Sequence, residues 1–420
     1  MKKMTTPQPV SRRGFLKSAL AAGAAPMILP AHLFGDAAPS NRVTSAHIGV
    51  GAQGGGLLAG TMGLRDVVQP VAACDPFQHR AAGAAQHMGA GARAYQDYRE
   101  LLARDDIDCV VIATPDHWHV PLSIAAIRSG KDVYLEKPMG VSIEENKRLR
   151  ATAHRYGAVF QYGTQQRSFS QHCGRVCELV RNGYIGELKE IHVVAPNGEA
   201  GGNPAPQPVP ADLDYDLWLG PAPEAPYTAD RVLGTGRWHI YDYAIGFIAG
   251  WGAHPLDVAH WGYPHIPVEY EGTGRIPEHG LYDTVLDWDV RGRYASGVQF
   301  TLKAGPDRTT FVGTEGTAWA SRGGVGANPE SLLHIKPGPD DVRLLQAQNH
   351  YRNFYECVRN RRTPVSDVDS ATQSDFMSHL GDIAIRTGRK IRWDEEREEI
   401  IGDRAAAAMT VRTARAPWIV

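Results

Sequence analysis

The sequence predicts an α/β protein: a doubly wound parallel sheet comes first, and an α+β domain with a large, open, mainly antiparallel sheet follows. Three observations predict this order. Strand-like and helix-like segments alternate over residues 42–163. A glycine-rich turn, Gly49-Val50-Gly51-Ala52-Gln53-Gly54, follows the first strand-like segment. After Gly163 the alternation stops, and strand-like runs lie among glycine, proline and aromatic residues.

The alternating region reads as a regular series of elements. We expect strands at 43–50, 67–74, 92–95, 109–113, 132–135 and 158–162. We expect helices at 54–64, 78–88, 98–103, 121–129 and 143–156. Such an alternation requires a parallel sheet with helices on both faces and right-handed crossovers. A ligand would then bind in the crevice at the carboxyl ends of the strands.

The glycine-rich turn has the features of a Rossmann dinucleotide fingerprint. Gly49 permits the tight turn, Gly51 lets the backbone approach a pyrophosphate, and Gly54 permits close packing of the helix on the strand. Gln53 lies within the same turn. Asp75 ends the second strand, where a carboxylate would hold the adenosine ribose hydroxyls. This acidic residue favours NAD over NADP, because a ribose phosphate would meet a like charge.

Two strings at strand ends face the same crevice. They are Ile112-Ala113-Thr114-Pro115-Asp116-His117-Trp118-His119 and Tyr134-Leu135-Glu136-Lys137-Pro138-Met139-Gly140. Together with the fingerprint they resemble the Gfo/Idh/MocA family of sugar and cyclitol oxidoreductases, and the resemblance spans nearly the whole chain after the leader. The family implies that Lys137 reaches toward the nicotinamide and the reacting hydroxyl. The expected cofactor-binding residues are Gly49, Gly51, Gln53, Gly54, Asp75, Thr114, Pro115, His117, His119, Glu136, Lys137, Pro138 and Gln165.

A lysine suits this place chemically, because its amine can donate to, or take a proton from, an oxygen whose carbon gives up hydride. The alternative is a surface ion pair with Glu136, which is a poor fit between a buried strand and a proline. Pro138 is expected to fix the turn that aims the lysine. The family suggests a cis peptide bond before this proline, which the sequence does not establish.

The region after Gly163 is expected to form the second domain. We expect strands at 188–194, 281–290, 297–304 and 309–312, and helices at 170–182, 346–360 and 367–388. The irregular stretch 195–236 is expected to form a wall over the active site. The expected domains are thus a leader at 1–40, a nucleotide domain at 41–164 and an α+β substrate and oligomerisation domain at 165–420. The open sheet suggests a homo-oligomer, a dimer or tetramer.

The second domain also carries the expected substrate residues. In the family an Asp commonly stands four residues before a His, and the pair grips a hydroxyl and takes its proton. His254 matches the His, but Gly250 stands at the Asp position. Asp257 lies one turn further on, and His254 and its aromatic neighbours also fit a buried core. The expected substrate contacts are Arg167, Arg237, Trp238, Tyr243, His254 and Asp257.

The N-terminus carries a twin-arginine export signal. Ser11-Arg12-Arg13-Gly14-Phe15-Leu16-Lys17 precedes an apolar stretch that ends near Leu29, and Gly35-Asp36-Ala37 offers small residues for cleavage. The stretch is too short and too rich in alanine and glycine for a membrane span. The signal addresses a route for folded proteins, so a cofactor bound in the cytoplasm would travel with the chain to the periplasm.

Composition excludes several classes of protein. With 44 basic and 46 acidic residues the net charge is -2, which offers no footprint for nucleic acid or an anionic membrane. Five cysteines argue against a disulfide framework. Cys173 and Cys177, beside His172, are one helical turn apart without a second ligand pair, so we expect helix packing and no metal site.

Three functions fit the sequence. The first is an exported oxidoreductase that acts on a small sugar or glycoside and recycles a tightly bound NAD. The second is an NAD-dependent glycosidase, which oxidises a ring hydroxyl transiently, eliminates the glycosidic bond, adds water and returns the hydride. The third is a sugar-binding or scaffold protein that has lost the chemistry. Lys137 and the intact fingerprint speak against the third, whereas Gly250 permits it.

Overall fold

The parallel sheet predicted for the first region is present. The computed structural model describes residues 42–418, so the leader predicted at 1–40 lies outside the described residues. Six parallel strands run in the order β3-β2-β1-β4-β5-β6. Their bounds are β1 Val43–Ile48, β2 Val68–Cys74, β3 Arg93–Tyr95, β4 Cys109–Ile112, β5 Asp132–Leu135 and β6 Phe160–Tyr162. The strand order reverses between β1 and β4, and ligands of such sheets bind at this switch point.

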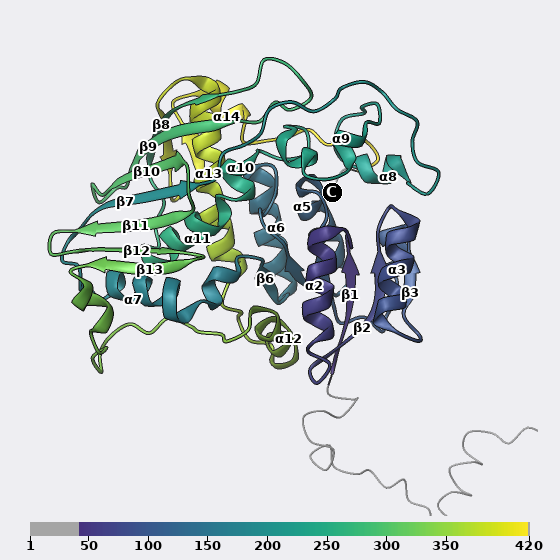
Figure 1. The fold of residues 1–420 in the computed structure, drawn as a ribbon, viewed down its shortest axis with the longest axis horizontal. Coiled ribbons are helices and arrows are strands. Elements are labelled where there is room, and N and C mark those ends of the chain that lie inside the picture. Colours follow the sequence, from purple (N-terminus) through teal and green to yellow (C-terminus); the bar gives the residue numbers. More distant parts are fainter. Residues whose placement is uncertain (1–41, 419–420) are drawn as a thin grey trace, which may run out of the picture. The chain divides into compact units, whose positions relative to one another are not determined.

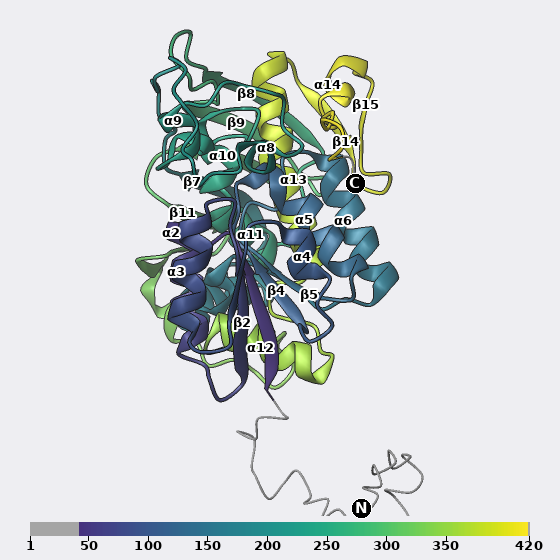
Figure 2. The same ribbon diagram turned by 90° about the vertical axis from the view of Figure 1, so that its right-hand side faces the viewer.

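Helices cover both faces of this sheet. They are α2 Ala52–Met62, α3 Gln78–Met88, α4 Tyr98–Leu102, α5 His119–Arg128 and α6 Ile143–Tyr156. Figure 2 shows α2 and α3 on one side of the strands and α5 and α6 on the other. The local signals explain why α6 matches its prediction: Ser142 caps its first turn, and Gly157 ends it with a φ of 61°.

A later helix completes the first layer. Helix α12 (His350–Asn360) packs on the nucleotide sheet beside α2, although it lies within the range expected for the second domain (Figure 1). The Tyr355 hydroxyl lies 2.8 Å from the Thr61 hydroxyl, and Gly60 leaves room for the Tyr351 ring, which a Cβ would approach to 2.9 Å. The chain therefore returns to the first layer after it has built the second sheet.

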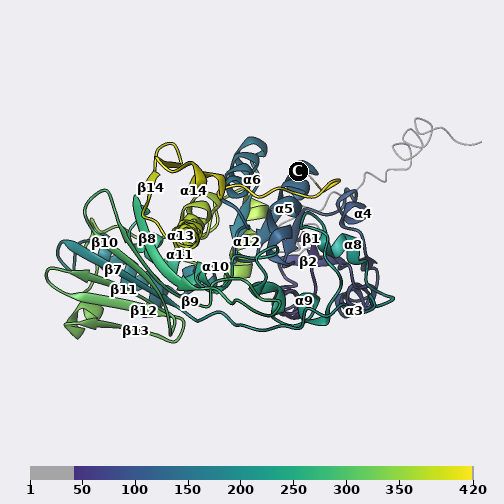
Figure 3. The same cartoon turned by 90° about the horizontal axis from the view of Figure 1, so that it is seen from above.

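The second sheet has nine strands in the order β13-β12-β11-β7-β10-β9-β8-β14-β15. Their bounds are β7 Leu188–Ala195, β8 Glu269–Arg275, β9 Asp287–Arg293, β10 Gln299–Ala304, β11 Arg308–Gly313, β12 Thr317–Ser321, β13 Gly324–Asn328, β14 Ile391–Asp394 and β15 Glu399–Ile401. Within this sheet only β7 and β10 pair in parallel among the described strands, so it is mainly antiparallel, as predicted. Helices α11 (Ala253–Gly262) and α13 (Val368–Thr387) cover one face (Figure 3).

The second region departs from its prediction in detail. The strand expected at 281–290 begins only at Asp287, because the amides of Leu281 and Asp283 bond to the Gly201 and His239 carbonyls. The helix expected at 170–182 is a π-helix at Ser170–Gly174 followed by α7 (Arg175–Arg181). The remaining short helices are η3 Asp116–Trp118, η4 Gln165–Ser168, α8 Tyr215–Leu219, α9 Ala229–Val232, η6 Gly236–His239, α10 Phe247–Gly250, η7 Glu330–His334 and α14 Arg404–Ala408.

Candidate functional site

The glycine turn after β1 has the shape that a dinucleotide phosphate requires. Gly49 has a φ of +80°, and a Cβ there would lie 2.6 Å from the Ala113 carbonyl oxygen. A Cβ on Gly54 would lie 1.9 Å from the Gly49 carbonyl oxygen, so both positions need glycine. Helix α2 begins after Gly51 with no side-chain cap and no acidic residue in its first turn. Its amide groups therefore fit an anion such as a pyrophosphate.

Asp75 supports this turn from the end of β2. One carboxyl oxygen accepts from the Val50 amide and the other from the Phe77 amide, both at 3.0 Å. Burial raises the pKa of this carboxyl, and the two amides oppose the rise. The Arg80 guanidinium lies 4.1 Å from the centre of the Phe77 ring, and its Nη1 would lie 3.5 Å from a Cβ on Gly51. A cation thus lies beside the expected ribose position.

An apolar slot opens at the ends of β1, β2 and β4. Gly49, Cys74 and Pro115 line this cavity of about 30 Å³ together with Tyr98 and Trp118. The apolar lining suits contact with an adenine ring, and the glycine turn and the α2 amides suit a pyrophosphate, as a dinucleotide requires.

The Glu136 carboxylate ties three segments of the crevice together. Its Oε1 accepts from the side-chain amides of Gln53 at 3.0 Å and Gln165 at 2.9 Å, and its Oε2 accepts from the Lys137 amide at 3.1 Å. Burial raises the pKa of Glu136, and Lys137 and these donors oppose the rise. Gly163 permits the approach, since a Cβ there would lie 3.0 Å from the carboxyl carbon.

His119 connects the two motif strings. Its Nδ1 lies 2.6 Å from the Pro138 carbonyl oxygen, and its Nε2 lies 3.0 Å from that of Thr114. Burial lowers the pKa of this imidazole to about 4, so it is neutral at pH 7 and donates to only one of the two oxygens. The Lys137–Pro138 peptide bond is cis. His119 therefore positions the segment that carries Lys137.

These elements meet at a cleft of about 190 Å³ between the two sheets. The sequence-predicted residues that line it are Gln53, Thr114, His119, Glu136, Lys137, Gln165, Arg237, Trp238 and His254. Asp116, Trp251 and Arg322 line it as well. Trp251 is one of the aromatic residues expected either to stack on a sugar ring or to lie in the core, whereas no role was predicted for Asp116 or Arg322. Arg322 lies in the turn between β12 and β13, so the second sheet reaches into the nucleotide crevice through this turn.

Lys137 points across the cleft to the position of the missing carboxylate. Its Nζ donates to the Gly250 carbonyl oxygen at 2.8 Å and lies 6.0 Å from the Trp238 ring centre. The nearest atom to a Cβ built on Gly250 is a Phe247 ring carbon at 3.8 Å. A backbone carbonyl thus replaces the expected carboxylate as the partner of the lysine, and the space of the absent side chain belongs to the cleft.

His254 is held by a residue that the sequence did not indicate. Arg322 Nη2 donates to His254 Nε2 at 2.9 Å, and His254 Nδ1 is buried without a hydrogen-bond partner among the described residues. Burial holds the pKa of His254 well below its usual value, and Lys137 and Arg322 lower it further. In this geometry Nε2 has no free lone pair for a substrate proton. This contact does not favour His254 as the base, and the expected role stays a prediction.

Three expected substrate contacts lie outside the cleft. Arg167 and Asp257 form a buried bidentate ion pair. Arg167 Nε and Nη2 donate to the two carboxylate oxygens of Asp257, each at 2.7 Å. Tyr243 is fully buried, and its hydroxyl accepts from Arg231 at 3.0 Å. These side chains do not line the cleft, so their expected contact with a substrate stays a prediction.

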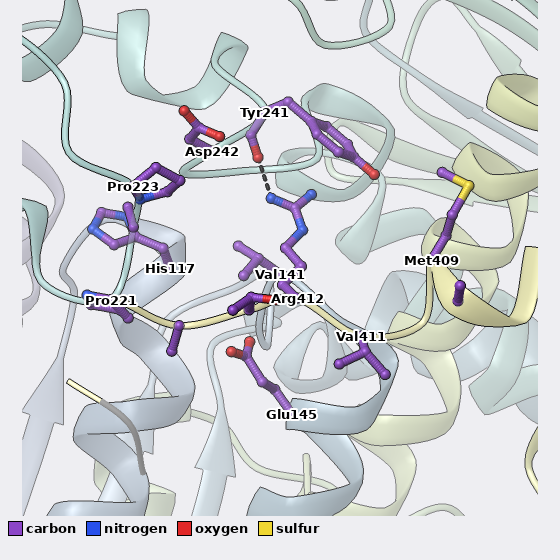
Figure 4. Close-up of a pocket in the computed structure, with 14 residues that line it drawn as sticks. His117, Val141, Glu145, Pro221, Pro223, Tyr241, Asp242, Met409, Val411 and Arg412 are labelled. Carbon is purple, nitrogen blue, oxygen red and sulfur yellow. Dashed lines mark hydrogen bonds between the residues drawn. The ribbon is translucent and has the colours of Figure 1, made fainter. Parts of the chain in front are cut away.

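His117 also lies away from the cleft. Its Nε2 contacts the Trp218 carbonyl at 3.2 Å, and its ring lines a second cavity of about 350 Å³ (Figure 4). Figure 4 shows Glu145 and Arg412 in the same cavity, where the chain after α14 passes over α6. Burial lowers the pKa of His117 to about 3. His117 therefore does not line the cleft, and its expected contact with the cofactor stays a prediction.

The described residues contain no group of three metal-ligating side chains, and no described helix is long and apolar enough to cross a membrane. Cys173 and Cys177 are buried in the core of the second domain. Their thiols contact the Ser321 and Val258 carbonyls respectively. This agrees with the expected helix packing.

A Rossmann crevice that presents a lysine at the carboxyl end of β5, opposite an open sheet domain, is typical of a nicotinamide-dependent oxidoreductase. The comparisons with known families agree. Residues 44–164 match the NAD-binding Rossmann domain of the Gfo/Idh/MocA oxidoreductase family, and residues 198–420, more than half of the chain, match its C-terminal alpha/beta domain. The chain belongs to this family. Residues 9–28 match a twin-arginine translocation signal, which indicates export by that route.

The curated relatives include two kinds of protein. A glycosyl hydrolase family 109 protein of Shewanella baltica is 40% identical over 98 residues, which cover 22% of this chain and 20% of the relative. An uncharacterized oxidoreductase of Rhizobium meliloti is 37% identical over 115 residues, 27% of this chain and 34% of the relative. The matched stretch thus spans a fifth to a third of the curated relatives.

Solved structures share the fold. The WlbA dehydrogenase of Bordetella pertussis, in complex with NADH and UDP-GlcNAcA, superposes with a TM-score of 0.63 at 17% identity over 84% of this chain and 99% of the other. An aldose-aldose oxidoreductase of Caulobacter crescentus, complexed with glycerol, gives 0.62 at 17% identity, with the same coverage. At this identity the likeness concerns the fold alone.

Proposed function

We propose that the protein oxidises or reduces a hydroxyl-bearing carbon of a sugar or glycoside, with a nicotinamide cofactor that is regenerated within each catalytic cycle. The observation that carries this proposal is the Lys137 ammonium at the cleft, opposite the Gly250 carbonyl. Export supports the recycling, because an enzyme outside the cytoplasm has no soluble nicotinamide pool to draw on. A twin-arginine substrate folds before export and carries its cofactor with it.

The chain's own residues divide the work between cofactor and substrate. The α2 amides and Gly51 would hold the pyrophosphate, and the slot beside Pro115 would take the adenine. A bound nicotinamide would supply the hydride acceptor at the cleft. Lys137 donates to the reacting oxygen, while His254, oriented by Arg322, and Trp238 contact the remaining hydroxyls and the ring.

The second candidate is a redox-neutral glycosidase. The similarity to glycosyl hydrolase family 109 proteins over 98 residues favours it. Transient oxidation would acidify the neighbouring C–H, and the same hydride would return after elimination and addition of water. A sugar-binding protein without activity is the third candidate, which the glycine at position 250 permits.

One experiment separates the three. The purified protein is incubated with aryl glycosides and, separately, with pairs of free sugars, and the products are identified by mass spectrometry. Oxidation of one sugar coupled to reduction of another is the expected result. Release of the aglycone without net reduction would show the glycosidase instead. Sugar binding without any conversion would support the third candidate, a sugar-binding protein without activity.

We expect the purified protein to contain NAD. Asp75 disfavours the ribose phosphate of NADP, whereas the neighbouring Arg80 offers a charge that favours it. NAD and NADP are therefore compared directly. The measurement is chromatography of the cofactor released on denaturation. NADP as the main species would contradict the proposal. In that case Arg80→Ala would weaken NADP binding and leave NAD binding nearly unchanged.

We also propose a homo-oligomer, with the free face of the nine-stranded sheet as its interface. That face is polar and carries ion pairs such as Arg275 with Asp287 and Lys303 with Asp289. Native mass spectrometry tests the proposal, and a monomer at micromolar concentration would contradict it. We also propose a domain boundary near residue 164 between the nucleotide domain and the second domain. Helix α12 follows this boundary in sequence but packs on the nucleotide sheet.

A further inference from the structure

Asp116 is a buried carboxyl group that the expected chemistry did not use. It begins η3, directly after the end of β4, and lines the cleft that Lys137 and His254 also line. Its side chain is 3% exposed, and its Oδ2 is buried without a hydrogen-bond partner among the described residues. A buried carboxyl oxygen without a donor is costly, so a site that retains one is expected to have a ligand for it.

The surroundings of Asp116 are mostly cationic. No carboxylate lies within 4.0 Å of the Lys137, Arg237 or Arg322 side-chain nitrogens among the described residues, so none of these cations is neutralised by an ion pair. The charged and titratable groups that face Asp116 or share its cleft are Lys137, Arg237, Arg322, His119, His254, Glu136 and, from α13, Asp375.

The other two candidate proton acceptors of the cleft are occupied. His254 Nε2 already accepts from Arg322. Both oxygens of Glu136 accept from amide groups of Gln53, Gln165 and Lys137. Lys137 donates to a carbonyl oxygen and so points a proton, not a lone pair, into the cleft. Asp116 Oδ2, by contrast, accepts from no donor among the described residues.

We propose that Asp116 accepts the proton of the reacting hydroxyl and so takes the place of the carboxylate that position 250 lacks. The proposal rests on the proposed function. The hydroxyl would lie between Lys137 Nζ and the Asp116 carboxylate, which form no ion pair with each other at 4.0 Å although they line the same cleft. The O–H proton passes to Asp116, and a bound nicotinamide would supply the acceptor for the hydride of the same carbon. The product is a C=O group with Asp116 protonated. The return reaction reverses each step.

The protonation behaviour of Asp116 suits this task. Burial raises the pKa of its carboxyl to about 7, and Lys137 and Arg237 oppose the rise. A group that titrates near neutral pH can both take and return a proton in each cycle. A carboxyl group at its ordinary pKa would take the proton but return it poorly.

The test compares Asp116→Asn with the unmodified holoprotein. Oxidation by the unmodified protein should rise with pH through an apparent pKa near 7, because the carboxylate is the competent form. Asparagine cannot accept the proton, so kcat of the variant at pH 8 should fall by about 10²-fold or more. The rise of the rate with pH, which is the acidic limb of the pH–rate profile, should disappear. The cofactor content of the variant should be unchanged. Asp132→Asn is the matched control, because this buried carboxyl lies at the opposite end of β5 and pairs with Arg361; it should keep the limb.

A second measurement does not depend on activity. The folded pKa of Asp116 lies above the unfolded value, so its contribution to stability is fully present below the unfolded pKa and is lost as pH rises through about 7. The Tm of Asp116→Asn relative to the unmodified protein should therefore rise by a few degrees between pH 5 and pH 8. An active variant that keeps the limb, or a Tm difference that does not change with pH, would overturn the proposal. A protein inactive on all sugars before substitution would instead overturn the proposed function.

Discussion

Replacing Lys137 by alanine is expected to lower kcat by about 10³-fold while the cofactor stays bound. Lys137 is the only lysine that lines the cleft among the described residues, and several contacts fix its position. The backbone amide of Lys137 donates to the Glu136 carboxylate, and His119 Nδ1 contacts the Pro138 carbonyl oxygen. Both contacts fix the segment that carries Lys137. The variant keeps this backbone and loses only the donor to the reacting oxygen.

The measurement is turnover of the sugar that the product assay identifies, together with the amount of cofactor released on denaturation. Lys147→Ala is the matched control, because this lysine pairs with Glu144 on the outside of α6. It should leave both quantities unchanged. Activity of the Lys137 variant within a few-fold of the unmodified protein would remove this residue from the mechanism, and loss of cofactor would show that it serves binding instead.

The nucleotide layer could be predicted well because its signals are local. The helix predicted at 143–156 matches α6, where Ser142 and Gly157 mark its two ends. The glycine turn could be interpreted for the same reason, since the need for glycine at Gly49 and Gly54 follows from the close approach of neighbouring backbone. Such requirements act within a few residues and can be recognised in the sequence.

The second sheet and half of the cleft could not be predicted because their determinants are distant in sequence. Strands β12 to β15 are short, and pairing across the sheet defines these strands and β8 more than periodicity does. Arg322 contacts His254 from a turn 68 residues away, which no spacing indicates. Asp116 stands within a quoted motif, but its unusual property comes from burial among Lys137 and Arg237, which only the fold brings together.

Replacing Arg167 by alanine is expected to destabilise the protein by about 3–5 kcal/mol, because the Asp257 charge would stay buried without its partner. The Arg167 side chain is 5% exposed and that of Asp257 is fully buried, so water cannot replace the guanidinium. The pair joins η4 to α11. Since η4 also carries Gln165, the loss should loosen the amide that donates to Glu136.

Calorimetry should show a Tm lower by about 5 °C for this variant. Arg397→Ala is the matched control, because its pair with Glu399 is exposed and should be worth less than about 1 kcal/mol. The double variant Arg167→Met with Asp257→Leu removes both charges and should recover most of the stability, since a buried ion pair often contributes little over an apolar pair of similar size. If the double variant is stable and still converts the sugar, the ion pair is a structural support of the cleft. If the double variant is stable but no longer binds sugar, the result would support the sequence-based prediction that Arg167 and Asp257 contact the substrate directly.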